Sequence, residues 1–316
     1  MFLNLAYITK VNIASLNGGE GSGGNVTAMK KISNANGDEF AYVSGQALRR
    51  YMKETLMQLG EKISSVDEKG NPTFLDKDKN GKEIFLDLNK KIDADILNKM
   101  YKSVCDLDLF GYMLPQGGRR WSPIKVSPLV SLLPYKGEYD YLTRKQKMED
   151  ESKKSGNIVQ VEIDTLNFMR GNIMVNLSHI GNEINEYTYA VNEILNQGEK
   201  NQRLNVFLDA IKSFNGGAKQ ARNLEDIAPK FIIITEQKTG NPFLLNSLQV
   251  DGHENINIEN LKESLTNNTT KRYTIGIDRG IFANEEEIKS SFENVVTVAQ
   301  AIEQYKNSIE EKDEGN

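Results

Sequence analysis

FLNLAYITKVNIASL, residues 2–16, is the stretch on which the fold depends. Apolar and polar side chains alternate along it, and a period of two residues predicts a β-strand with one buried and one open, polar face. The predicted buried face is Leu3, Leu5, Tyr7, Val11 and Ile13, and the predicted open face is Asn4, Lys10 and Asn12.

The next segments outward predict a loop and then a helix. The glycine-rich composition of residues 17–25, NGGEGSGGN, predicts a flexible loop. In VSGQALRRYMKETL, residues 43–56, Ser44 suits the N-cap position. Helical spacing gathers a core stripe on one side of this helix. That stripe is Leu48, Met52, Thr55, Leu56 and Leu59.

Further elements complete an α+β pattern. The order strand, helix, strand, strand, helix, strand is that of the split βαβ, ferredoxin-like plan. The later predicted elements are a strand in DLDLFGYM (106–113), an extended run at 121–135, a strand at 166–178, a helix at 203–214, strands at 230–235 and 273–277, and a helix at about 285–310. Residues 61–100 interrupt the plan as an insertion with a β-hairpin, followed by a helix around 93–104, and the polar residues 136–160 predict a protruding loop or hairpin.

Composition limits the classes of function. The net charge of the 316 residues is -5, but residues 283–316 hold nine acidic residues and three lysines, so the rest of the chain is close to neutral. The single cysteine excludes an internal disulfide, and two histidines leave metal sites short of ligands, so we predict no metal and no cofactor. Without a membrane-length apolar run or a leader peptide, we expect a cytoplasmic protein that contacts no membrane.

Three motifs resemble catalytic or metal-binding sites, but the residues of each motif fit a different interpretation better. GGEGSGG lacks the lysine and the following helix of a phosphate loop. DKDKNGKEIFLD, residues 76–87, matches part of a calcium loop, but its Asn80-Gly81 pair favours a hairpin. Asp106 and Asp108 would share one face of a strand as a carboxylate pair, although no histidine or further acid lies nearby, which favours a structural role.

The basic residues form the most informative pattern. Gln46, Arg49, Arg50 and Lys53 share the face of the helix opposite its core stripe, with Glu54 as the only acid from residue 43 to residue 59. A phosphate at such a helix start would receive N–H groups and guanidinium groups together. Further cations and aromatic rings suit a single-stranded nucleic acid. They are Arg119, Arg120, Lys125, Lys136, Arg144, Lys145, Lys147, Lys219 and Arg222, with Trp121, Tyr135, Tyr139 and Tyr141.

The segments VSGQALRR, DLFGYM, WSPIKVSPLVSL and FNGGAKQARNL occur in an order that resembles the CRISPR-associated DevR family, the backbone subunit of type I-B Cascade. The resemblance covers most of residues 1–236. It implies a ferredoxin-like or RRM-like palm, a fingers insertion and a β-hairpin thumb. The implied boundaries are 1–60 and 106–282 for the palm, 61–105 for the fingers, about 134–163 for the thumb and 283–316 for an acidic C-terminal helix and tail.

The resemblance also implies a function. Such subunits bind the phosphates of a guide crRNA, stack head to tail into a helical filament with copies of themselves and present bases to target DNA. The implied partners are crRNA, target DNA and the other Cascade subunits, namely a large subunit and subunits that bind the crRNA ends. The family's helix contacts fall on Arg49 and Lys53, and its glycine-rich loop falls on Gly216, Gly217, Lys219 and Gln220. The predicted RNA-binding residues are Ser44, Gln46, Arg49, Arg50, Lys53, Arg119, Arg120, Lys125, Lys219, Gln220 and Arg222.

Two alternatives stay open beside this non-enzymatic scaffold. Related type III subunits cut target RNA with an aspartate in the loop after the first strand. Here only Asp38 lies in that loop, without the surrounding pattern. A metal-dependent ribonuclease using Asp38, or Asp106 and Asp108, is therefore the enzymatic alternative. A DNA-binding regulator is the third class, but no helix-turn-helix signal is visible.

Overall fold

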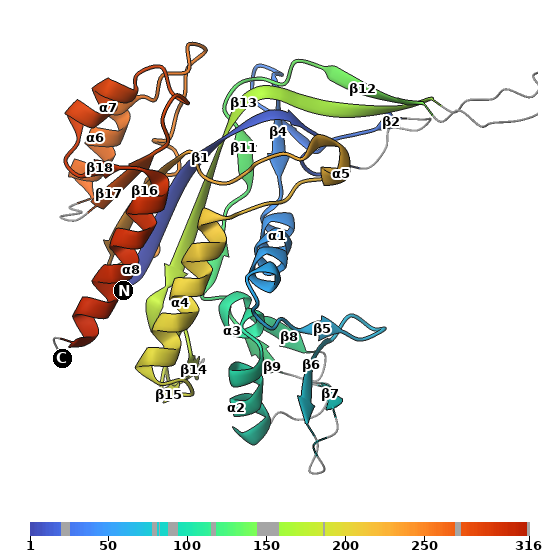
Figure 1. Ribbon diagram of the computed structural model, residues 1–316, viewed down its shortest axis with the longest axis vertical. Helices are drawn as coiled ribbons and strands as arrows, with labels where there is room; N and C mark the ends of the chain where they lie inside the picture. The colour runs from blue at the N-terminus through green and yellow to red at the C-terminus, as the bar shows by residue number, and fades with distance from the viewer. Residues whose placement is uncertain are drawn as a thin grey trace, which may run out of the picture.

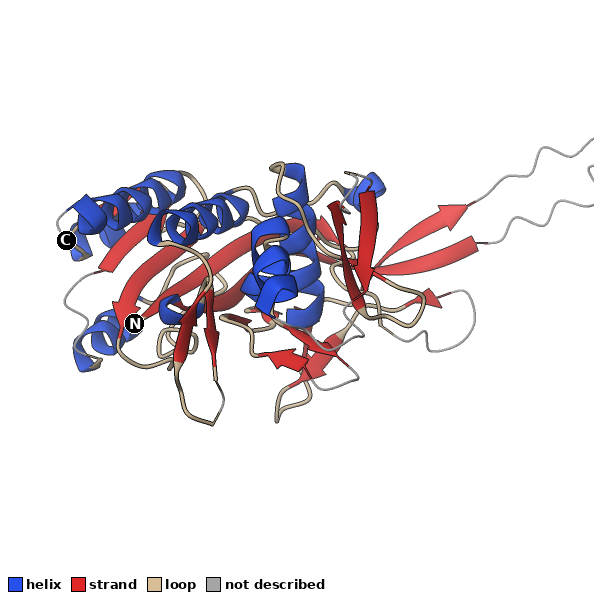
Figure 2. Ribbon diagram, turned by 90° about the horizontal axis from the view of Figure 1, so that it is seen from below, coloured by secondary structure: helices blue, strands red, loops and turns tan. Residues whose placement is uncertain are grey.

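The computed structural model describes residues 1–19, 26–77, 81, 83–87, 94–114, 118–143, 158–185, 187–268 and 273–314. One large mixed sheet runs through it, and helices lie on both sides of that sheet (Figures 1 and 2). The main path of the sheet is β18-β17-β16-β1-β13-β11-β4-β3. These strands are β18 (Val295–Val296), β17 (Tyr273–Ile277), β16 (Phe231–Gln237), β1 (Phe2–Ala14), β13 (Ile158–Asn176), β11 (Leu129–Ser131), β4 (Glu39–Val43) and β3 (Lys31–Ser33).

The centre of this sheet has ferredoxin-like topology. Strand β1 pairs antiparallel with β16 on one side and with β13 on the other. Strands β10 (Ile124–Val126) and β11 pair antiparallel with β13. Helix α1 (Gly45–Gln58) follows β1, and α4 (Gln197–Lys212) lies between β13 and β16. The predicted α+β fold is therefore confirmed, with residues 124–131 as the second strand of the plan.

Both faces of β1 are covered along its first residues, so the predicted open polar face is wrong at Asn4, although Asn12 is exposed as predicted. Ile13, which was predicted to be buried, is 53% exposed. Leu3 and Leu5 belong to the core under α1, α4 and α8 (Val298–Glu314). Ala6 and Ile8 belong to a second core on the opposite face, under α6 (Ile258–Asn267) and α7 (Glu285–Ser291). The sequence of a strand that is paired on both sides and buried on both faces is a nearly continuous apolar run. The polar Asn4 interrupts this run and is fully buried.

The insertion contains the predicted hairpin and helix. Phe74 in the hairpin, Met100 and Tyr101 in the helix, and Leu195 share a third, smaller core. Residues 106–113 are not one strand, because Asp106–Phe110 form a short helix that ends at Gly111. The elements of this region are β5 (Ser65–Val66), β6 (Pro72–Lys77), β7 (Glu83–Asp87), α2 (Ala94–Ser103), α3 (Asp106–Phe110), β8 (Tyr112–Leu114) and β9 (Gly118–Arg120).

Strand β13 extends beyond the sheet and carries the predicted hairpin. Its first residues pair antiparallel with β12 (Glu138–Thr143) and parallel with β2 (Val26–Thr27). Strand β12 and the first part of β13 leave the body of the molecule side by side in Figures 1 and 2. Residues 144–157 of the predicted thumb, with Arg144, Lys145 and Lys147, lie outside the described residues.

The acidic C-terminal region is two helices and not the single one predicted at 285–310. Helix α7 ends before Phe292, and Asn294 has a positive φ of 56°. Strand β18 then pairs parallel with β17 before α8 begins. The other small elements are η2 (Leu177–His179), β14 (Asn182–Ile184), β15 (Val191–Glu193) and α5 (Gln220–Asn223). Among the described residues, no helix is long and apolar enough to cross a membrane.

Candidate nucleic-acid interface

The start of α1 is held rigidly at the end of β1. Ser44 is the N-cap, as predicted, and its hydroxyl accepts a hydrogen bond from the backbone N–H of Ala47 at 3.3 Å. Its own N–H donates to the side chain of Asn17 at 3.2 Å. A Cβ at Gly45 would lie 2.7 Å from the carbonyl oxygen of Val126, so β10 packs directly on the helix start. This contact brings the backbone of β10 beside the first turn of α1, while the exposed Lys125 side chain projects from the face of β10 opposite Ile124 and Val126.

The three cations on α1 differ in what they contact. Arg50 is 78% exposed and pairs with Glu54 at 2.9 Å, a surface pair of small energetic weight. Lys53 Nζ lies 2.8 Å from a carboxylate oxygen of Asp106, which is completely buried. The predicted free cluster is therefore partly neutralised by the protein, and Lys53 is committed to a buried partner.

Arg49 is the exception in this cluster. Its guanidinium donates to the carbonyl oxygen of Phe110 and lies over the Phe110 ring, 5.6 Å from the centroid. Burial lowers the pKa of Arg49, and no carboxylate contacts it among the residues that the structure describes. A half-buried cation without a counter-charge gains more from an anion than a paired one does.

Arg120 cannot serve as predicted, because its guanidinium is buried inside the protein. It donates to Asp108 at 2.5 Å and to the backbone carbonyls of Asn182 and His179 at 2.7 and 2.5 Å. Its side chain is only 4% exposed. This prediction is corrected: Arg120 fixes the connection between β9 and β14.

The carboxylate pair considered at Asp106 and Asp108 is fully engaged. Asp108 also accepts from Arg203 at 2.9 Å and from the N–H of Gly181 at 3.1 Å. Asp106 accepts from the backbone N–H and hydroxyl of Ser64, both at 2.7 Å. Both aspartates are completely buried. Their lone pairs are used by protein donors, which is the arrangement of structural carboxylates.

The glycine-rich loop lies directly against α1. A Cβ at Gly216 would meet the ring of Tyr51 at 2.4 Å, and the N–H of Ala218 donates to the carbonyl of Leu16 at 2.7 Å. Lys219 is partly exposed and has a φ of 59°, a strained conformation for a residue with a side chain. The prediction that Gln220 contacts RNA is corrected, because its side-chain amide bonds within the loop. The amide oxygen accepts from the N–H of Glu225 at 2.9 Å, and the amide nitrogen donates to the carbonyl oxygen of Gly216.

Arg222 connects this loop to the hairpin. It pairs with Asp140 of β12 at 3.0 Å, with both side chains partly exposed. Tyr139 and Tyr141 on the same strand are 41% and 59% exposed. Alternation along a strand places these two rings on one face and Asp140 on the other. The loop, the start of α1 and the base of the hairpin therefore meet at the C-terminal end of β1.

We call the group Gln46, Arg49, Arg50, Lys125 and Lys219 the basic cradle. Arg119 is exposed outside this group, with its guanidinium 5.1 Å from the centroid of the Trp121 ring. Tyr189 faces the same small cavity as Trp121 and was not predicted. Positions 121 and 189 line one cavity only in the folded chain, and no local pattern in the sequence signals this.

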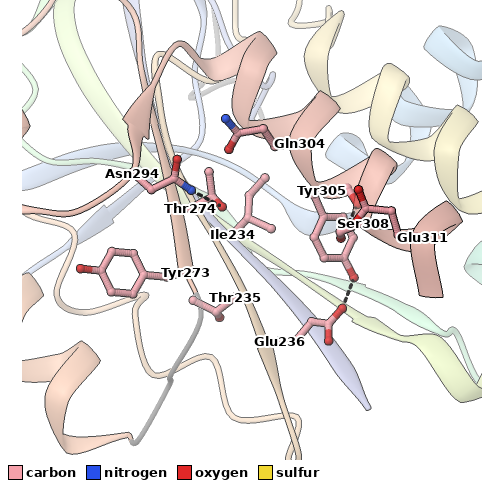
Figure 3. Close-up of a pocket in the computed structure, with 10 residues that line it drawn as sticks. All are labelled: Ile234, Thr235, Glu236, Tyr273, Thr274, Asn294, Gln304, Tyr305, Ser308 and Glu311. Atoms are coloured by element: carbon pink, nitrogen blue, oxygen red, sulfur yellow. Dashed lines mark hydrogen bonds between the residues drawn. The ribbon is translucent and has the colours of Figure 1, made fainter. Parts of the chain in front are cut away.

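Other surfaces suit a nucleic acid less well. The cavity between α8 and the strands β16 and β17 (Figure 3) measures about 310 Å³. Tyr305 donates to Glu236 at 2.9 Å across its wall, and Glu311 adds a second carboxylate. No cation is among the described residues that line it, so it repels phosphate. Asp38 lies in the exposed turn after β3, where Asn34 donates to it at 2.9 Å. Within the described ranges, no group of three metal-ligating side chains could hold an ion.

Comparisons with known proteins give a family and a fold. The model of the family described as "CRISPR-associated negative auto-regulator DevR/Csa2" matches residues 6–252. A chain of a solved "CRISPR RNA-guided surveillance complex, pre-nicking" is similar at a TM-score of 0.63 and 13% identity, over 98% of this chain and 100% of that chain. A chain of another "CRISPR RNA-guided surveillance complex" gives 0.57 and 14%, over 98% and 99%. No curated protein sequence matches.

Proposed function

Because this chain belongs to the CRISPR-associated DevR/Csa2 family, we propose that it is a non-catalytic backbone subunit of a type I-B Cascade complex. It binds guide crRNA through the phosphates, stacks head to tail with copies of itself along that RNA and leaves bases free to pair with target DNA. Its other partners are the large subunit and the subunits at the crRNA ends. The complex acts in the cytoplasm.

The observation that carries this proposal is the basic cradle on α1 and on the two segments that contact it. Three of its cations come from three different segments: Arg50 from α1, Lys125 from β10 and Lys219 from the glycine-rich loop. The cradle has a half-buried guanidinium, that of Arg49, without a carboxylate partner among the described residues. A phosphate chain supplies the missing negative charge at several points at once.

The chemistry of the cradle also suits a guide of any sequence. Lysine and arginine side chains contact phosphates, which are the same at every nucleotide. In RNA-guided recognition, base pairing carries the specificity, so a subunit that held particular bases would restrict the usable guides. Exposed rings at Tyr139 and Tyr141 add stacking surfaces that tolerate every base.

The ribonuclease alternative has less support. Asp106 and Asp108 are buried and bonded to protein donors, and the Asp38 carboxylate accepts from Asn34 in an exposed turn. A direct test is to incubate the assembled complex with complementary RNA and Mg²⁺. Cuts at fixed intervals that disappear in an Asp38→Ala variant would overturn the non-catalytic role.

The test of RNA binding uses exposed cations, because Lys53 and Arg120 have buried carboxylate partners. We expect the variant Arg50→Glu/Lys125→Glu/Lys219→Glu to purify without RNA, so that its ultraviolet absorbance ratio is that of protein alone. Lys238→Glu is the control, since Lys238 is exposed and follows β16, which pairs with β1 on the side away from β13 and β10. It should keep uniform-length RNA. Equal RNA content in the two variants would refute the proposal, provided that circular dichroism shows both to be folded.

A further inference from the structure

Trp121 is an unusual surface residue. It is 67% exposed, although a large indole normally contributes to a core or to a binding site. Tyr189 is 78% exposed and has a φ of 56°, which is rare for a residue with a bulky side chain. The two side chains line one cavity of about 280 Å³ between β9 and the turn that joins β14 to β15. Two exposed rings at one cavity indicate a site for a flat ligand.

The wall of this cavity is polar and preorganised. Arg120 is fixed by Asp108 and lies over the ring of Tyr101, 4.9 Å from its centroid. One oxygen of Glu183 accepts from Tyr101 at 2.8 Å, which leaves the other oxygen able to accept from a ligand. Burial lowers the pKa of His179, so its ring is neutral at pH 7 and offers an acceptor nitrogen. A purely apolar occupant would leave the second Glu183 oxygen and the His179 acceptor nitrogen without partners.

The cavity adjoins the basic cradle through the chain itself. Gly111 packs so closely on the following hairpin that a Cβ there would lie 2.9 Å from the backbone nitrogen of Ser122. The residue before Gly111 is Phe110, whose carbonyl receives the guanidinium of Arg49. The residue before Ser122 is Trp121. Arg49 and the exposed indole therefore flank the same backbone contact.

We propose that the cavity between Trp121 and Tyr189 binds one unpaired nucleobase of a single strand whose phosphates lie in the basic cradle. The base stacks on the indole, and its polar edge faces Glu183 and His179. This inference rests on the proposed RNA-binding function and adds a base-binding position to it. Aromatic stacking with a nearby guanidinium is the usual way in which proteins hold single-stranded bases.

Trp121 is the only tryptophan in the chain, so its fluorescence reports on this cavity alone. Full-length protein freed of nucleic acid at high salt is titrated with hexauridylate and with an abasic chain of six sugar-phosphates. Stacking predicts that hexauridylate quenches Trp121 and that the abasic chain binds without quenching it. If both chains bind and neither changes the fluorescence, as when the cavity receives a protein side chain, the base site is refuted and the cradle stands. If neither binds, the proposed function fails as well.

A variant pair tests the contribution of the second ring. Tyr189→Ala should weaken hexauridylate binding by about 5- to 150-fold, which corresponds to the loss of one base-aromatic contact. Binding of the abasic chain should not change. Tyr187→Ala is the matched control, because Tyr187 is 90% exposed on the same turn and does not line the cavity. Equal affinities for hexauridylate in the two variants, with equal melting temperatures, would overturn the proposal.

Discussion

Asp108 links three segments of the molecule, and replacing it by asparagine should destabilise the fold strongly. The carboxylate is completely buried and contacts Arg120 at 2.5 Å and Arg203 at 2.9 Å, while the N–H of Gly181 donates to it at 3.1 Å. Asparagine has nearly the same shape but no charge, and it presents an NH₂ group to one of the guanidinium groups. Among the described residues, Arg203 would then lose its carboxylate partner, and Arg120 would keep only Glu183, whose carboxylate lies 3.9 Å away.

Removing one partner from a buried ion pair costs about 3–5 kcal/mol, because the remaining charge stays desolvated without compensation. We expect Asp108→Asn to lower the free energy of unfolding, measured in urea, by about that amount. Glu193→Gln is the control, because Glu193 is 63% exposed in its pair with Lys200, and its loss should cost less than about 1 kcal/mol. A loss below about 1 kcal/mol for Asp108→Asn would contradict the structural role, and a normal fold with lost RNA cleavage would favour the nuclease alternative.

Two further predictions concern buried titratable groups at other positions. Burial raises the pKa of Asp164 to about 6, so the folded state holds this proton more tightly than the unfolded chain and loses stability as the pH rises from about 4 to about 6. Asp164→Asn should therefore be more stable than the parent protein at pH 7.5, with a smaller difference at pH 4.5, and a pH-independent difference in urea midpoints would contradict this assignment. Burial raises the pKa of the Cys105 thiol to about 12, so a thiol reagent should modify the native protein slowly and the urea-unfolded protein completely. Rapid labelling in the absence of urea would show that the site around Cys105 opens.

The sequence predicted the fold well where one local pattern determined an element. The capping serine and the apolar residues from Leu48 to Leu56 of α1, the pairing of β6 with β7 and the short apolar strand β16 all have signals within a few residues. Asn80 of the predicted turn lies outside the described residues. Errors arose where distant segments decide the outcome. Nothing near β1 shows that residues 244–292 cover its second face, and this cover buries Asn4. The break between α7 and α8 likewise depends on the pairing of β18 with β17.

For the candidate site, too, local signals in the sequence were predictive and contacts between distant segments were not. Basic residues at helical spacing located a charged face on α1, but sequence spacing cannot reveal the partner of each cation. Lys53 contacts Asp106, which is 53 positions away, and Arg120 lies among buried acceptors from η2 and β14. The cations that stay exposed come from α1, β10 and the glycine-rich loop, and only the folded chain brings them together.

The dependence of RNA affinity on salt tests the basic cradle most directly. Each phosphate contact with a single strand contributes about -0.7 to the slope of log Kobs against log salt. The account predicts that the slope for hexauridylate becomes less negative by about 2 in Arg50→Glu/Lys125→Glu/Lys219→Glu and stays unchanged in Lys238→Glu. An unchanged slope in the triple variant, with a weakened slope in the control, would show that the strand lies elsewhere on the protein.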